Sequence, residues 1–202
     1  KVEFKNVLQI DPKTAAPYLY LGQIAERDQD WRKAFGNYSK AVELDPELFD
    51  ERIRLGRFYV LAGEIDKAVE QADEALTREP ANADALTLRA SILMRQDKAD
   101  ESVEILKQVL AADAGHVGAA TVLFSIYESQ EKAAEAIAVL ESAVAADPET
   151  AALQLRLAQA YLNQKENEKA EAIMLDLVRD YPEELQYRVM TASYYAQMDQ
   201  AD

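Results

Sequence analysis

A 34-residue period runs through the chain without an insertion and constrains its fold more than any other feature. Blocks that can be written under one another begin at Ala15, Phe49, Ala83, Val117, Ala151 and Leu185. Proline closes the blocks in register at Pro12, Pro46, Pro80, Pro148 and Pro182, and Ala114 stands at the remaining place. Such self-similarity indicates a stack of equivalent units, each of which buries its apolar face only against its neighbours.

Each block contains two segments of about 14 residues with helical apolar periodicity. Helix-forming residues dominate the composition, and only six glycines and six prolines are present, too few for an all-β chain. Gly63 lies in the short joint of the second block and is suited to end its first helix. Pairs such as Asp45-Pro46 end the second helix, because the residue before proline resists the helical region. The sequence therefore predicts an all-α fold.

The pattern resembles the tetratricopeptide repeat over the whole chain. The residues that match its signature best are Tyr18, Leu21, Gly22, Ala34, Tyr38, Ala41 and Pro46. The resemblance implies a right-handed α-solenoid of antiparallel helix pairs. It predicts five full repeats at 15–48, 49–82, 83–116, 117–150 and 151–184. Residues 1–14 would be the second helix of a truncated repeat, and residues 185–202 the first helix of another.

Charge and composition exclude several classes of function. The net charge of −15 opposes binding to nucleic acid or to an anionic membrane surface. The absence of cysteine excludes disulfides and thiolate metal sites, and no apolar run is long enough to span a bilayer. The chain begins at Lys1 without a signal-like start, so we expect it to be an excised piece whose targeting signal lies elsewhere.

The sequence predicts neither an enzyme nor a cofactor or metal site. His116 is the single histidine, and we expect it to be a polar residue in the connection between two helix pairs. The six glycines are scattered and form no phosphate-binding loop. The acidic runs lack calcium-loop spacing and are interpreted as solvated charges near helix starts.

The resemblance implies a concave groove lined by the first helix of each pair. The projected groove residues are Tyr20, Gln23, Arg27, Ile53, Arg54, Arg57, Leu88, Ser91, Met94, Arg95 and Arg156. Guanidinium groups bind carboxylates bidentately, so the predicted partner is a protein or peptide segment with acidic groups or a free carboxylate. In the alternative interpretation these arginines only neutralise neighbouring acids such as Glu26 or Asp50.

Three biological settings stay open. The segment from Phe4 to Pro12 is similar to bacterial tetratricopeptide proteins of exopolysaccharide assembly and export, which implies a scaffold in the periplasm or cell envelope. The alternatives are a cytoplasmic adaptor for an acidic peptide tail and a regulatory array attached to a catalytic domain. Because Val189, Met190, Tyr194 and Tyr195 would lack a second helix to cover them, we also expect end-to-end self-association.

The third block departs most from the pattern and is the predicted site of a soft joint. Arg89 replaces an apolar residue, Ala114 replaces the closing proline, and Phe124 stands in the next block at the place of Gly22 and Gly56. We expect amide hydrogen exchange to be faster between Arg89 and Phe124 than in the flanking blocks. Uniformly slow exchange across this segment, measured by mass spectrometry, would contradict the joint.

Overall fold

The computed structural model describes residues 13–198, so residues 1–12 of the predicted truncated repeat lie outside the described part. Every regular element within residues 13–198 is an α-helix. The helices are α2 (Ala15–Arg27), α3 (Trp31–Leu44), α4 (Phe49–Ala62), α5 (Ile65–Arg78), α6 (Ala83–Arg95), α7 (Ala99–Ala112), α8 (Val117–Ser129), α9 (Ala133–Ala146), α10 (Ala151–Asn163), α11 (Asn167–Asp180) and α12 (Leu185–Met198). The all-α class is thereby confirmed.

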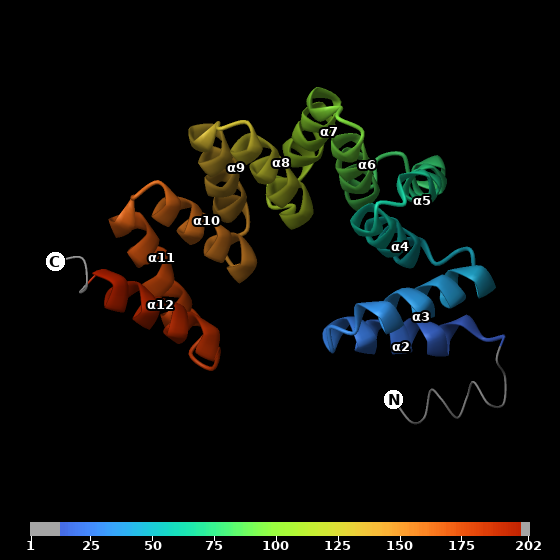
Figure 1. Cartoon of the computed structure of the whole chain (residues 1–202), viewed down its shortest axis with the longest axis horizontal. Coiled ribbons are helices and arrows are strands. Elements are labelled where there is room, and N and C mark those ends of the chain that lie inside the picture. The colour runs from blue at the N-terminus through green and yellow to red at the C-terminus, as the bar shows by residue number, and fades with distance from the viewer. Residues whose placement is uncertain (1–12, 199–202) are drawn as a thin grey trace. The chain divides into compact units, whose positions relative to one another are not determined.

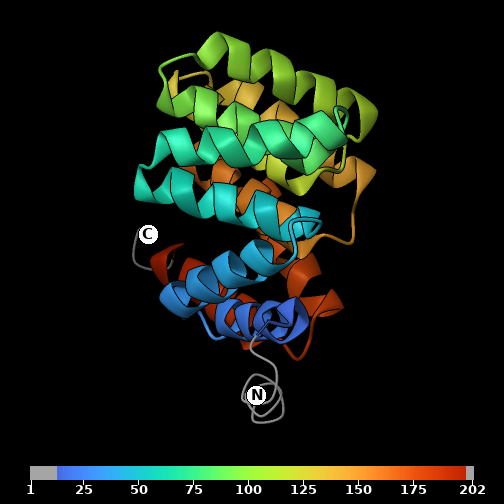
Figure 2. The ribbon, with the colours of Figure 1, turned by 90° about the vertical axis from the view of Figure 1, so that its right-hand side faces the viewer.

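Each 34-residue block from Ala15 onward begins with a helix at its first residue. Within blocks α2 packs against α3, α4 against α5, α8 against α9 and α10 against α11 (Figure 1). Between blocks α3 contacts α4 and α5 contacts α6, and Figure 2 shows these helices from another side. Likewise α9 contacts α10 and α11 contacts α12. Within each unit, these neighbouring helix pairs thus pack against one another, which is the packing that tandem repeats require.

The chain divides into two compact units, Lys1–Ile105 and Leu106–Asp202, and each is described by itself. In the described part of the first unit, apolar clusters form around Tyr38 and Leu55 and around Ile53 and Leu88. The second has a continuous core that includes Phe124, Leu140 and Met174. The division falls inside α7, within the segment from Arg89 to Phe124, but the flexibility of that segment stays a prediction.

One turn geometry joins the two helices of every pair. The residues at the turn have positive φ: Gln29, Gly63, Asp97, Glu131 and Lys165, with values from 58° to 77°. The following N–H reaches back to the helix that has ended, as from Glu64 N to Tyr59 O at 2.9 Å and from Lys98 N to Leu93 O at 2.9 Å. This is the Schellman arrangement, which satisfies carbonyls at the helix end. Gly63 ends α4 as expected, whereas the other four turns use residues with a side chain.

The connections between pairs are held in two ways. Where α4 and α10 begin, the fourth residue of the helix donates a side-chain hydrogen bond to the carbonyl of the preceding proline: Arg52 to Pro46 O at 3.2 Å, and Gln154 to Pro148 O at 2.6 Å. Where α6 and α8 begin, a side-chain N-cap serves instead. Asn82 Oδ1 accepts from Ala85 N at 3.0 Å, and His116 Nδ1 accepts from Ala119 N at 3.1 Å. The single histidine therefore lies in a connection between pairs and caps a helix.

Departures from the repeat pattern have local partners. Arg89 extends from α6 to Asp73 of α5, with Nη1 2.5 Å from Oδ1. Ser102, where other repeats have alanine, is buried and donates its hydroxyl to Ala90 O at 2.9 Å. Each polar substitution is therefore satisfied by hydrogen bonding, which keeps its desolvation cost low.

The close approach of α2 and α3 depends on Gly22. A Cβ at Gly22 would lie 2.7 Å from two atoms of the Tyr38 ring, and this ring is fully buried. A Cβ at Gly36, also within a helix, would meet nothing within 4 Å.

These two glycines make a matched test of the packing. We expect Gly22→Ala to lower the free energy of unfolding by about 1–3 kcal/mol, because the buried ring must move. Gly36→Ala should raise it by about 0.5–1 kcal/mol through helix propensity alone. Urea unfolding followed by circular dichroism measures both. Equal effects of the two substitutions would show that the contact at Gly22 is not tight.

Candidate partner-binding site

The first helices of successive pairs are linked by ion pairs in the first unit. Arg54 of α4 reaches Glu26 of α2, with Nη1 3.1 Å from Oε2 and 3.2 Å from Oε1. Arg57, one turn later on α4, pairs with Asp84 of α6. These contacts align α2, α4 and α6 and set the positions of both guanidinium groups.

The predicted groove residues of the first unit divide into exposed and buried ones. Tyr20, Gln23, Arg27, Arg57 and Arg95 are exposed, and Arg54, Ser91 and Met94 are half-buried. The Ser91 hydroxyl is engaged by Thr87 O at 3.0 Å.

The structure corrects the prediction that Ile53 and Leu88 line the groove. They are only 2% and 1% exposed, because both side chains pack into the same apolar cluster between α4, α5 and α6. They stabilise the stack and present no accessible apolar wall to a partner.

A hollow of about 500 Å³ lies at the C-terminal half of α4. Its lining consists of Glu26, Trp31, Arg54, Arg57, Phe58, Leu61 and Ala62. Two of the predicted arginines are therefore brought together beside a largely apolar wall. Its volume is within the range of pockets that bind ligands.

Sequence reasoning missed the apolar wall, although a signal was present. Leu61 occupies the place that is filled by Arg27, Arg95, Ser129 and Asn163 in the other full repeats. Its side chain is 76% exposed, so the packing of the repeat does not require an apolar residue there. Trp31, 55% exposed, contacts Phe58 with a ring-centroid distance of 6.4 Å and so links the first pair to α4. A comparison of each surface position across the repeats would have identified Leu61.

The acid at the hollow takes part in a small hydrogen-bond network. The Tyr38 hydroxyl donates to Glu26 Oε2 at 2.6 Å, while the same carboxylate accepts from Arg54. Burial raises the pKa of Tyr38 far above its ordinary value, and the hydrogen bond to Glu26 raises it further. The pairing with Glu26 is one of the contacts expected by the alternative interpretation of the arginines. The ion pairs of Arg54 and Arg57 are partly solvated, however, and such pairs contribute only about 0–1 kcal/mol.

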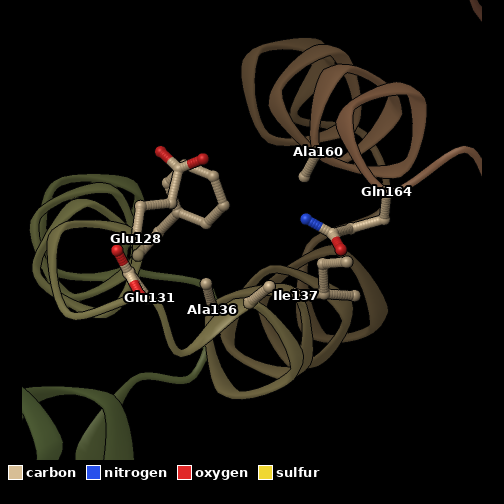
Figure 3. A pocket seen from close by; sticks show the side chains of 8 residues that line it. Glu128, Glu131, Ala136, Ile137, Ala160 and Gln164 are labelled. Carbon is tan, nitrogen blue, oxygen red and sulfur yellow. The ribbon is translucent and has the colours of Figure 1, made fainter.

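Arg156 lies in the second unit and is described separately. Its guanidinium carbon is 5.8 Å from the centre of the Phe124 ring, a cation–π contact. Together with Glu128, Gln159 and Asn163 it lines a hollow of about 410 Å³ between α8 and α10. An adjoining hollow of about 350 Å³ shares Phe124 and Glu128. In Figure 3, Gln164 extends over Ile137, while Glu128 and Glu131 lie on the opposite side.

No group of three or more His, Asp or Glu side chains within residues 13–198 is arranged to hold a metal ion. None of the helices described here combines the length and apolar character needed to cross a bilayer.

Comparison with known proteins identifies the same repeat. Two family models described as tetratricopeptide repeat match residues 53–117 and 127–193, together more than half of the chain. The BBSome complex member BBS4 of Bos taurus is 36% identical over 76 residues, which are 38% of this chain and 15% of that protein. The match therefore spans only a small part of that relative.

Solved structures share the fold at low sequence identity. TTC0263, a thermophilic tetratricopeptide repeat protein of Thermus thermophilus, superposes with a TM-score of 0.73 at 18% identity, covering 91% of this chain and 100% of that one. A tetratricopeptide repeat protein of Parabacteroides merdae gives 0.77 at 16% identity, covering 96% and 76%. Yeast Tom70 gives 0.64 at 22% identity, covering 97% and 43%.

The helix pairs, their common turn and the exposed face of the first helices define a helical-repeat protein of the α-solenoid class. The chain belongs to the tetratricopeptide repeat family. Proteins of this family are generally non-catalytic scaffolds for protein–protein interaction, and they bind protein or peptide partners.

The burial and hydrogen bonds of Tyr38 and Tyr161 predict that these two side chains ionise at a higher pH than exposed tyrosines do. Tyr38 and Tyr161 are buried and donate to Glu26 and Glu141, and both effects raise their pKa above that of a tyrosine in the unfolded chain. The stability that this provides is therefore present at neutral pH and is lost as the pH rises above about 10. Of the ten tyrosines, we expect a fraction to form tyrosinate only on unfolding, and Tyr38→Phe to reduce that fraction. Ultraviolet absorbance during alkaline titration measures it, with the chain unfolded in denaturant as control. A single transition of all ten tyrosines in the folded protein would contradict the network.

Proposed function

We propose that this chain is a non-enzymatic scaffold that binds a segment of a partner protein through the first-helix face of its first unit. The partner segment bears acidic side chains or a free carboxylate. One observation carries the proposal: Arg54 and Arg57 line an open hollow with exposed apolar side chains, in a chain whose net charge is −15.

The guanidinium groups retain donors for a partner. An arginine has five N–H donors. Within residues 13–198, hydrogen bonds engage Nη1 of Arg54 and Nη2 of Arg57. Arg54 Nε is buried, so Nη2 is the donor that Arg54 retains for a partner. Because the existing ion pairs are weak and partly solvated, an incoming carboxylate competes at low cost and gains bidentate geometry. Arg27 and Arg95 are exposed on neighbouring first helices and add two guanidinium groups to this face.

The test is a matched pair of charge reversals. Peptides of 12 random residues displayed on phage are selected on the full chain, and we expect the bound pool to be rich in Asp and Glu. Arg54→Glu with Arg57→Glu should weaken binding of that pool by more than tenfold, because attraction becomes repulsion. Arg78→Glu with Arg179→Glu gives the same net charge on the second helices α5 and α11 and should leave binding unchanged.

Two results would refute the proposed function. One is a selected pool with no acidic bias. The other is an equal effect of the two double variants, because then only the net charge of the chain matters.

We also propose a biological setting for this chain and an association between copies of it. The likeness of Phe4 to Pro12 supports a bacterial envelope or exopolysaccharide assembly complex, and the alternatives are a cytoplasmic adaptor or a regulatory array. A signal or anchor in the full gene product supports the first, its absence the second, and an appended enzyme domain the third.

Exposed Leu185, Val189 and Tyr195 on α12 support association of two copies through this apolar face, whereas Tyr194 is buried in the core.

A further inference from the structure

We infer that the hollow between α2, α3 and α4 is an anchor pocket for one bulky apolar side chain of the partner, adjacent in the partner sequence to a carboxylate. The inference rests on the proposed function and names the motif that it recognises. The anchor pocket is defined by Trp31, Phe58, Leu61 and Ala62 as the apolar wall and by Arg54, Arg57 and Glu26 as the polar rim.

The apolar wall is exposed, and the packing of the repeat does not require an apolar residue at the place of Leu61. Leu61 and Trp31 of the wall are 76% and 55% exposed, and at the place of Leu61 the other full repeats have polar residues. Covering such surface with an apolar group releases about 25 cal/mol for each Å² removed from water. A partner side chain that contacts both residues therefore gains affinity, and a polar one does not.

The wall is also preorganised. The Phe58 ring lies 6.0 Å from the Phe35 ring and 6.4 Å from the Tyr38 ring, centroid to centroid, in addition to its contact with Trp31. Tyr38 is in turn fixed by its hydrogen bond to Glu26. Because the aromatic rings are already held in place, little side-chain entropy is lost when a ligand binds.

The arginines of the rim favour a carboxylate next to the apolar anchor side chain of the partner. Arg54 and Arg57 lie one turn apart on α4 and line the same hollow as Leu61. A carboxylate within one or two residues of the apolar side chain can therefore reach a guanidinium group while the anchor stays in the pocket. The self-association proposed above would use exposed side chains of α12, and none of these lines the anchor pocket.

Trp31 provides a direct probe, because it is the only tryptophan in the sequence. Its indole N–H gives one cross-peak in a nitrogen–proton correlation spectrum, which responds to occupation of the pocket. The probes are three acetylated and amidated peptides, Ser-Gly-Phe-Asp-Glu-Gly-Ser, the same peptide with Phe replaced by Ser, and the same peptide with Asn and Gln in place of the acids.

We expect the first peptide to shift the Trp31 peak in a saturable manner. The peptide without Phe and the peptide without acids should each bind on the order of tenfold more weakly. Leu61→Gln keeps the reporter and the helix propensity, and should weaken the first peptide on the order of tenfold. Leu175→Gln, at an exposed leucine of α11, is the matched control and should have no effect.

The outcomes separate this inference from the proposed function. The inferred anchor pocket is wrong, while the acidic preference stands, if the peptide without Phe binds as well as the first peptide. The same holds if the Leu61→Gln variant binds the first peptide normally. If removal of the acids has no effect, the proposed function and the motif both fall. A shift of the Trp31 peak with protein concentration alone shows that a second copy occupies the pocket and overturns the inference.

Discussion

Within each unit, the structure depends on apolar surface that neighbouring helix pairs share. A single pair has apolar residues on more than one flank and cannot cover them alone. Within the first pair, Tyr38 lies against Gly22, and Leu55 from the next pair completes the same cluster. The same interlocking recurs in the second unit from α8 to α12. The inner positions of each repeat are therefore fixed by packing.

Positions outside this shared packing are free to carry recognition. The place of Leu61 illustrates the point, because its side chain is exposed and the corresponding residues elsewhere are polar. A repeat protein thus separates the two demands on its sequence: recurring residues specify the fold, and departures from recurrence on the surface indicate binding. Departures in the interior are instead compensated locally, as the hydroxyl of Ser102 is by Ala90 O.

The charged residues are likewise divided between roles in the fold and roles in recognition. The ion pairs that link α2, α4 and α6 orient Arg54 and Arg57, and both pairs are exposed enough to exchange partners. Glu26 has a further role, since it also accepts from the buried Tyr38 hydroxyl. One carboxylate thereby connects the core of the first pair to the rim of the anchor pocket.

The sequence by itself determined the helical class, the 34-residue unit and the family, because period and turn residues are local properties of the chain. It also predicted Arg54 and Arg57 on one face. It did not distinguish Ile53 and Leu88 from exposed groove residues, since helical periodicity places a residue on a flank without saying whether the neighbouring pair covers that flank. The sequence also did not show that Trp31 and Leu61 form one apolar wall, because the two residues come from different helix pairs. Only the packing of one pair on the next decided which side chains were buried and which of them met, and that packing joins residues far apart in the chain.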